Sequence, residues 1–263
     1  MRYRLLTVLC LAAMPSAAWA GERDYCPDRP GISTPACTMA PGEWSVEVGL
    51  GDWTLDRSAG QREDVTLLGD TLLRRGIAEH AELQVEWAAL GLARTRDEAV
   101  ISHATSVGDF TLAVRRNLAN PDGSGLSVAL MPFVSLPLGH EPVGAGDWAA
   151  GLQVPLSYEV SDKVSLVTTT AFEAAVDEDG HGRHFAFDET VGTSLKLDAD
   201  LTATAEYQFT ADRDPQQHHD EHLAGLSLGW QPSDDLQLDL GANAGLDHDA
   251  PDMEVYVGVS RRF

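Results

Sequence analysis

The sequence has little of what a helical membrane protein or a nucleic-acid-binding protein needs. Its N-terminal apolar run, residues 5–14, is well short of the roughly 20 residues that cross a bilayer as a helix, and no run near that length follows it. Basic residues are scarce, with 18 Lys and Arg against 41 Asp and Glu, for a formal net charge of −23. Phosphates would be repelled by such a chain, which excludes nucleic acid as a partner.

Signatures of catalysis and of phosphate binding are also missing. The letters Gly-x-Ser-x-Gly occur at 225–229, but inside an alternating strand segment, and the serines Ser157, Ser165 and Ser227 have no histidine at a neighbouring mid-strand position. The glycine pairs at 49–51 and 123–125 lack the strand-turn-helix context of a phosphate-binding loop. We therefore expect neither an enzyme nor a protein with a bound organic cofactor.

The N-terminus has the layout of an export signal. Arg2 and Arg4 precede the apolar run, and the small residues Ala18 and Ala20 flank Trp19, as at a signal-peptidase site. This pattern predicts a signal peptide at residues 1–20, cleaved after Ala20, and so an oxidising destination for the mature chain.

Residues 21–42 follow as a segment rich in proline and glycine with no periodicity. It contains Cys26 and Cys37, the two cysteines that remain after cleavage. In an oxidising compartment such a pair is expected to form a disulfide. A metal site would call for more thiols or a nearby histidine, and this segment supplies neither.

The rest of the chain, residues 43–263, alternates between apolar and polar residues in segments of strand length. In the last of them, Val255, Val257, Val259 and Phe263 share one face. This alternation predicts all-β structure, but it suits a soluble sandwich as well as a membrane barrel. We count twelve such segments, at residues 44–50, 65–73, 81–89, 110–114, 128–136, 148–158, 164–174, 185–197, 201–209, 224–230, 236–240 and 253–263.

The connections between the segments favour the barrel. Every second link is short, as at 74–76, 161–163, 198–200 and 231–235, with a longer one at 117–125. The intervening links are longer or richer in charge, at 56–64, 94–107, 139–146, 177–183, 212–221 and 247–252. Short turns on one side and long loops on the other are typical of outer-membrane barrels. We predict a transmembrane antiparallel up-and-down β-barrel of about twelve strands, with the short turns in the periplasm.

Three residues conflict with this assignment. Glu189 falls on the apolar face of its strand, where a carboxylate near mid-bilayer is unfavourable. Pro132 and Pro155 lie inside strands and cannot donate a hydrogen bond to a neighbouring strand. We expect β-bulges at the two prolines, or else one misplaced strand boundary, and a bulge could also turn Glu189 inward.

Two stretches resemble a known family. The head carries Cys-Pro-Asp-Arg-Pro-Gly at 26–31, Thr-Pro at 34–35, the second cysteine and Pro-Gly at 41–42, while the tail is MEVYVGVSRRF. Together with the strand pattern, these motifs resemble outer-membrane transporters related to the MetA-pathway phenol-degradation barrels. The resemblance implies a location in the bacterial outer membrane, contact with its lipid and lipopolysaccharide, and recognition of the terminal Phe263 by the barrel-assembly machinery.

For function, the resemblance implies passive passage or binding of a small solute. Few aromatic residues fall on the lumen side, so the sequence does not identify the solute, and the lumen of so small a barrel could instead be filled by its own side chains. The head segment could lie at or inside the periplasmic mouth as a partial plug. The charged residues predicted to face the lumen are Glu47, Glu86, Arg115, Glu159, Glu206, Asp239 and Glu254.

The histidines suggest an alternative function. All but His80 lie in or beside the predicted external loops, among carboxylates, as in QQHHDEH at 216–222. Imidazole and carboxylate groups suit zinc, copper or nickel, and acidic loops can also hold divalent cations loosely. A non-transporting surface barrel could therefore bind divalent metal, or a partner, through its external loops, with His181, His184, His218, His219, Asp220, His222 and His248 as candidate ligands.

Overall fold

The computed structural model describes residues 23–58, 60–97 and 100–263, so the predicted signal peptide lies outside the described residues. The described residues form one antiparallel sheet. Its strands are β1 (Trp44–Asp56), β2 (Gln61–Ala78), β3 (Ala81–Asp97), β4 (Val100–Ser106), β5 (Phe110–Ala119), β6 (Leu126–Leu136), β7 (Ala149–Ser161), β8 (Val164–Val176), β9 (Arg183–Lys196), β10 (Leu201–Arg213), β11 (His218–Ser233), β12 (Leu236–Gly245) and β13 (Met253–Arg262).

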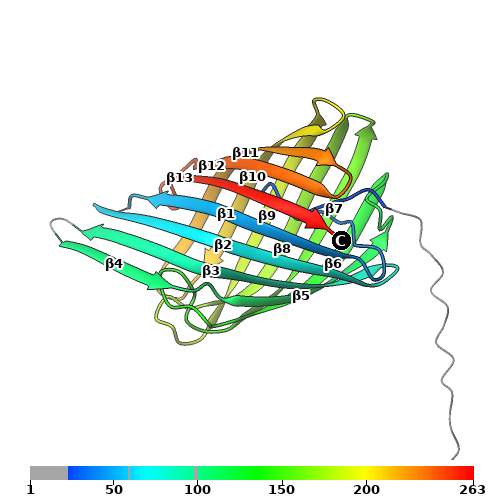
Figure 1. Ribbon diagram of the computed structural model, residues 1–263. Helices are drawn as coiled ribbons and strands as arrows, with labels where there is room; N and C mark the ends of the chain where they lie inside the picture. Colours follow the sequence, from blue (N-terminus) through cyan, green and yellow to red (C-terminus); the bar gives the residue numbers. More distant parts are fainter. Residues whose placement is uncertain (1–22, 59, 98–99) are drawn as a thin grey trace, which may run out of the picture.

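The sheet closes into a barrel of twelve strands, as predicted (Figure 1). β13 pairs with β12 on one side and with β1 on the other, and β2 bridges β1 to β3. β3 pairs along its first half with β5 and along its second half with β4, so β4 extends the β5 wall beyond the ring. Closure leaves the ring with no free edge, which is the condition for crossing a membrane with strands.

Among the described residues, no helix is long and apolar enough to span a membrane.

The burial of side chains is the reverse of that in a soluble protein. The largest fully buried side chains include Arg74, Arg115, Glu47 and Glu82. Large apolar side chains are exposed on the outer wall instead, among them Trp87, Leu130, Leu166, Val191, Leu226, Leu240 and Val257. An apolar exterior around a polar interior is the arrangement expected of a barrel surrounded by lipid.

The strands run further than the sequence indicated. β2 continues to Ala78, so the predicted link 74–76 is strand and the turn lies at residues 79–80. β3 and β4 form a hairpin over most of the predicted loop 94–107, and β11 begins at His218 within the predicted loop 212–221. β2, β3 and β11, with 18, 17 and 16 residues, exceed the 9–11 residues that cross a bilayer. We call the end with the C-terminus and the shorter turns the turn end, and the opposite end the loop end.

The expected bulges at the three conflicting residues are absent. The register runs unshifted past Pro132, Pro155 and Glu189. Glu189 points outward beside Phe209, and the hydroxyl groups of Thr168 and Thr170 donate to its carboxylate at 2.7 and 2.6 Å. The prediction that Glu189 turns inward was wrong, because two outward hydroxyls supply the hydrogen bonds that lipid cannot.

Candidate functional site: the barrel lumen

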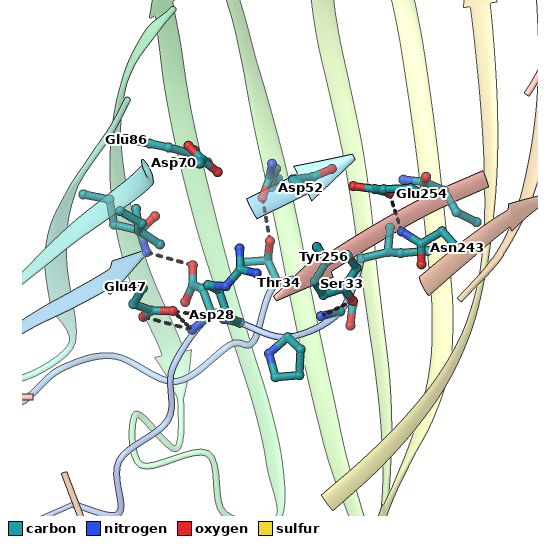
Figure 2. A pocket seen from close by; sticks show the side chains of 18 of the residues that line it. Asp28, Ser33, Thr34, Glu47, Asp52, Asp70, Glu86, Asn243, Glu254 and Tyr256 are labelled. Carbon is teal, nitrogen blue, oxygen red and sulfur yellow. Dashed lines mark hydrogen bonds between the residues drawn. The ribbon is translucent and has the colours of Figure 1, made fainter. Parts of the chain in front are cut away.

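The lumen contains the N-terminal segment, which we define as residues 23–41. Cys26 and Cys37 form the predicted disulfide within it. Its two ends are held at the turn end of the barrel, where Arg23 donates to the carbonyl oxygen of Glu79 at 2.7 Å and Thr38 donates its backbone N–H to Pro121 at 2.9 Å. Between those points the segment crosses the interior of the barrel, as Figure 2 shows for the stretch from Asp28 to Thr34.

Asp28 fixes the first half of the segment in a buried ion cluster. Its carboxylate receives both terminal nitrogens of Arg115, at 2.9 and 2.5 Å, and lies 3.1 Å from Arg74 Nη1. Arg74 also contacts Glu47 at 2.9 Å and Glu82 at 3.0 Å. We call Asp28, Glu47, Arg74, Glu82 and Arg115 the ion cluster. The four barrel side chains in it are fully buried, so each charge depends on the others for stabilisation.

The pKa of Asp28 reflects this environment. Burial acts to raise it, but the charges of Arg115 and Arg74 outweigh burial and hold the pKa of Asp28 below its usual value. Glu47 also holds the segment, because its carboxylate accepts the backbone N–H groups of Asp28 and Arg29 at 2.9 and 3.0 Å. The cluster therefore anchors both a side chain and the backbone of the N-terminal segment.

The second half of the segment is held by the opposite wall. Arg29 forms an ion pair of 3.1 Å with Asp239 on β12. Glu206 on β10 accepts the backbone N–H groups of Ile32 and Ser33 at 2.8 and 2.9 Å. Thr34 donates its N–H to Thr169 on β8 at 2.9 Å. Wall side chains thus satisfy the backbone of a segment that has no regular secondary structure of its own.

Glycines in the wall make room for the segment. A methyl group on Gly258 of β13 would overlap the guanidinium group of Arg29, and one on Gly76 of β2 would overlap the backbone of Ala40. At both places the segment approaches the strand backbone more closely than a larger residue would permit.

The segment lies between two cavities of the lumen. The cavity on the loop side has a volume of about 390 Å³ and that on the turn side about 250 Å³. Both are bounded by Asp28, Arg29, Pro30 and Ser33. The turn-side cavity continues toward the mouth, because a further cavity of about 740 Å³ shares Cys26, Pro35 and Val167 with it. The segment is therefore the narrow element between the two cavities.

The loop-side cavity is strongly acidic. Asp52, Asp70, Glu86 and Glu254 line it beyond the segment, and Arg29 is the arginine in its lining. Figure 2 shows these four side chains on one side of the crossing chain. Asn243 donates to Glu254 at 2.6 Å. We call these four residues the acidic set; they differ from the ion cluster in having no arginine among them.

One irregularity brings Asp52 into this cavity. The register between β1 and β13 shifts by one residue between Gly49 and Gly51, so Leu50 is bulged. Unbroken alternation from the inward Glu47 would place Asp52 on the outer wall. The bulge reverses the alternation and pairs Asp52 with Tyr256 inside the barrel.

The residues predicted to face the lumen all lie along it. Glu86 and Glu254 line the loop-side cavity, and Glu159 lines the cavity at the turn-end mouth. The remaining four contact the N-terminal segment or its ion cluster: Glu47, Arg115, Glu206 and Asp239. They hold the segment in place, a role that the sequence did not indicate.

The candidate metal ligands do not form one group. His222 points outward, where its ring packs 5.2 Å from that of Phe209 and Nδ1 lies 2.5 Å from the Tyr207 hydroxyl. Asp220 pairs with Arg213 at 2.6 Å, and His219 lies 3.4 Å from Glu178. His181, His218 and His248 are exposed. His184 differs from the others in lying almost buried among three aspartates.

Sequence reasoning missed several residues of the site. Arg74 was assigned to a turn, and Glu82 has the inward parity but was not selected. Asp28 and Arg29 lie in a segment without periodicity, although their position inside a motif of the resembled family was a usable signal. Nothing in the sequence indicates that Asp52 faces the lumen, because its orientation depends on a bulge.

Comparison with known proteins fits this geometry. Residues 27–263 match the family described as "Putative MetA-pathway of phenol degradation". The chain belongs to this family. The match begins inside the N-terminal segment, so the segment is part of what the family shares. No curated protein sequence gives a significant match.

Solved structures show the same fold. An outer membrane channel from Pseudomonas putida F1 aligns with a TM-score of 0.68 at 12% identity, over 93% of this chain and 99% of that one. The NanC porin aligns with a TM-score of 0.52 at 9% identity, over 83% and 98% of the two chains. The KdgM porin, solved in complex with disordered oligogalacturonate, gives 0.51 at 10% identity, over 84% and 99%. At these identities the likeness establishes the outer-membrane barrel fold.

Proposed function

We propose that this protein is a narrow passive channel of the bacterial outer membrane that passes small hydrophilic solutes and prefers cations. The acidic set is the observation that carries this proposal. Four carboxylates surround a cavity of about 390 Å³ in which Arg29, itself paired with Asp239, is the basic residue. Low-dielectric walls around like charges concentrate the field and attract ions of opposite sign.

The N-terminal segment sets the size limit in this proposal. A solute that enters from the loop end meets the acidic set first, then passes the segment between Asp28 and Ser33, and leaves through the wider turn-end mouth. The polar groups of the lining are carboxylate, amide and hydroxyl, which suit hydrated ions and small polar molecules. Porins and channels among the structural neighbours support passage, and also support a non-enzymatic role.

Reversal potentials in planar bilayers test the proposal. Under a KCl gradient the purified barrel should conduct with cation preference. The combined variant Asp52→Asn, Asp70→Asn, Glu86→Gln, Glu254→Gln should lose most of that preference while still conducting. The control Asp162→Asn with Asp198→Asn, two exposed residues of the turn end, should leave the preference close to wild type.

Two other results would contradict the proposal. A correctly folded barrel, recognised by its heat-dependent mobility on gels, that conducts no ions would favour the alternative of a non-transporting surface protein. If the barrel conducts but its ion selectivity does not change when the acidic set is neutralised, other residues determine the selectivity. Recognition of Phe263 by the assembly machinery and contact with lipopolysaccharide stay predictions, tested by deleting Phe263 and measuring the yield of folded barrel in the outer membrane.

A further inference from the structure

We propose that Asp177, His184 and Asp214 form a binding site for a divalent transition-metal ion at the loop end of the lumen, with Asp212 orienting the imidazole ring. The three ligands come from separate parts of the chain: the β8–β9 loop, the start of β9 and the β10–β11 loop. One potential ligand atom from each of these residues lies within 4.8 Å of those from the other two.

Burial separates this group from ordinary loop carboxylates. The side chains of His184 and Asp214 are 5% and 1% exposed, and that of Asp177 is 13% exposed. His184 pairs in register with Ala175, while its neighbour Phe185 is exposed on the outer wall, so the imidazole is on the lumen side. The site is therefore enclosed by protein on the lumen side of the strand.

The distances between the potential ligand atoms match those between two ligands of one metal ion. Nδ1 of His184 lies 3.0 Å from Asp177 Oδ1 and 3.4 Å from Asp214 Oδ2. Two ligand atoms that are each about 2.0–2.1 Å from a tetrahedral zinc ion lie roughly 3.3 Å apart. An ion could thus replace the proton between the imidazole and the carboxylates with small movements of the side chains.

The surrounding hydrogen bonds have the arrangement found around metal ligands. The other ring nitrogen, Nε2, lies 2.8 Å from Asp212 Oδ1, and a carboxylate on that nitrogen fixes the ring and makes Nδ1 a better ligand. Asp214 is held in turn by the backbone N–H groups of Glu178 and Gln216, at 2.8 and 2.7 Å. These contacts are an observation separate from the ligand cluster itself, and they orient both ligands before an ion arrives.

Charge and donor type indicate which ions would bind. Three carboxylates around a single imidazole leave a negative site that a divalent cation would neutralise in large part. One nitrogen and two oxygen donors favour zinc, copper, nickel or cobalt over calcium and magnesium, which take oxygen ligands. The remaining coordination position would be open to solvent at the mouth. A bound ion would also join the β8–β9 and β10–β11 loops.

Zinc binding to the metal-stripped, detergent-solubilised full barrel tests the proposal, with a coloured chelator as competitor. We expect one zinc ion per barrel. Asp212→Asn should weaken binding roughly 10- to 100-fold, the usual cost of losing the group that orients a ligand. His184→Ala and Asp214→Asn should weaken it more. Cobalt bound to the wild type should show the visible absorption of a low-coordinate site, and His184→Ala should abolish it.

The exposed histidines provide the matched control. His218→Ala and His248→Ala remove the same ligand type from the same end of the barrel and should leave zinc affinity unchanged. Heat-dependent gel mobility confirms that each variant is folded. The proposal is overturned if the wild type takes up no zinc at micromolar concentrations. It is also overturned if binding survives His184→Ala but is lost with His218 or His248. The proposal does not depend on whether the barrel conducts.

Discussion

Two groups of acidic residues in the same lumen do different things. In the ion cluster, Glu47, Glu82 and Asp28 surround Arg74 and Arg115, and every carboxylate has a guanidinium group within 3.1 Å. The acidic set lies just beyond the segment on the loop side, with Arg29 as the arginine in its cavity lining. The paired charges hold a chain segment, whereas the carboxylates of the acidic set form no ion pair within the described residues and, in the proposed function, attract cations. The number of charged partners, and not the residue type, distinguishes the two groups.

Removing an arginine from the ion cluster should produce the largest effect. Arg74→Met leaves Glu47 and Glu82 fully buried without their main partner. Breaking a buried pair in this way typically costs about 3–5 kcal/mol, because an uncompensated charge stays in the interior. Chemical unfolding of the folded barrel in detergent should show a loss of that size. A matched change at the exposed pair, Arg57→Met, should leave the unfolding curve almost unchanged.

The same variant should also loosen the segment. Arg74 contacts both Asp28 and the carbonyl oxygen of Cys26, so its loss frees the first half of the segment. Larger and noisier single-channel currents should accompany the loss of stability. An unfolding curve like that of the wild type would show that the cluster does not stabilise the barrel.

Acid should release the N-terminal segment only at a pH below the usual pKa of an aspartate. The pKa of Asp28 is lowered from 3.8 in the folded barrel, so its contribution to stability is present above 3.8 and is lost as the pH falls through the lowered value. Single-channel conductance should therefore stay constant from neutral pH down to that region and then rise. Asp28→Asn cannot titrate and should show no such step. A step near neutral pH in the wild type would assign the change to a different group.

The sequence predicted the barrel well because alternation repeats in strand after strand, and errors in one strand do not change the count. The disulfide also followed from local information, since Cys26 and Cys37 were the two cysteines left in an exported chain. The details of the lumen depended on long-range structure. A bulge at Leu50 turns Asp52 inward, and the extension of β2 to Ala78 converts Arg74 from a turn residue into the centre of the ion cluster.

The histidines show the same limit. The positions of the long links in the sequence placed most of the histidines near the loop end. Which histidine side chain lies close to carboxylates depends on strand register. His222 is turned outward by its pairing with Phe209, while His184 is turned inward by its pairing with Ala175. A shift of one residue in either strand would exchange these orientations. Register is set by pairing along the whole barrel, and loop composition carries no information about it.

The smallest expected effect is a gain of stability, opposite in sign to the loss expected for Arg74→Met. It tests the acidic set instead of the ion cluster. Glu86 belongs to the acidic set, near Asp70, in a cavity where Arg29 is the basic residue and the other charged lining groups are carboxylates. Glu86→Gln keeps the shape and removes one repulsive charge, so the free energy of unfolding should rise, by on the order of 1 kcal/mol or less for charges separated by water. The gain should shrink at high salt, because screening already weakens the repulsion in the wild type. Unfolding at low and high salt measures both effects. A loss of stability would mean that Glu86 has a structural partner, and the distinction between the two groups of charges would then fail.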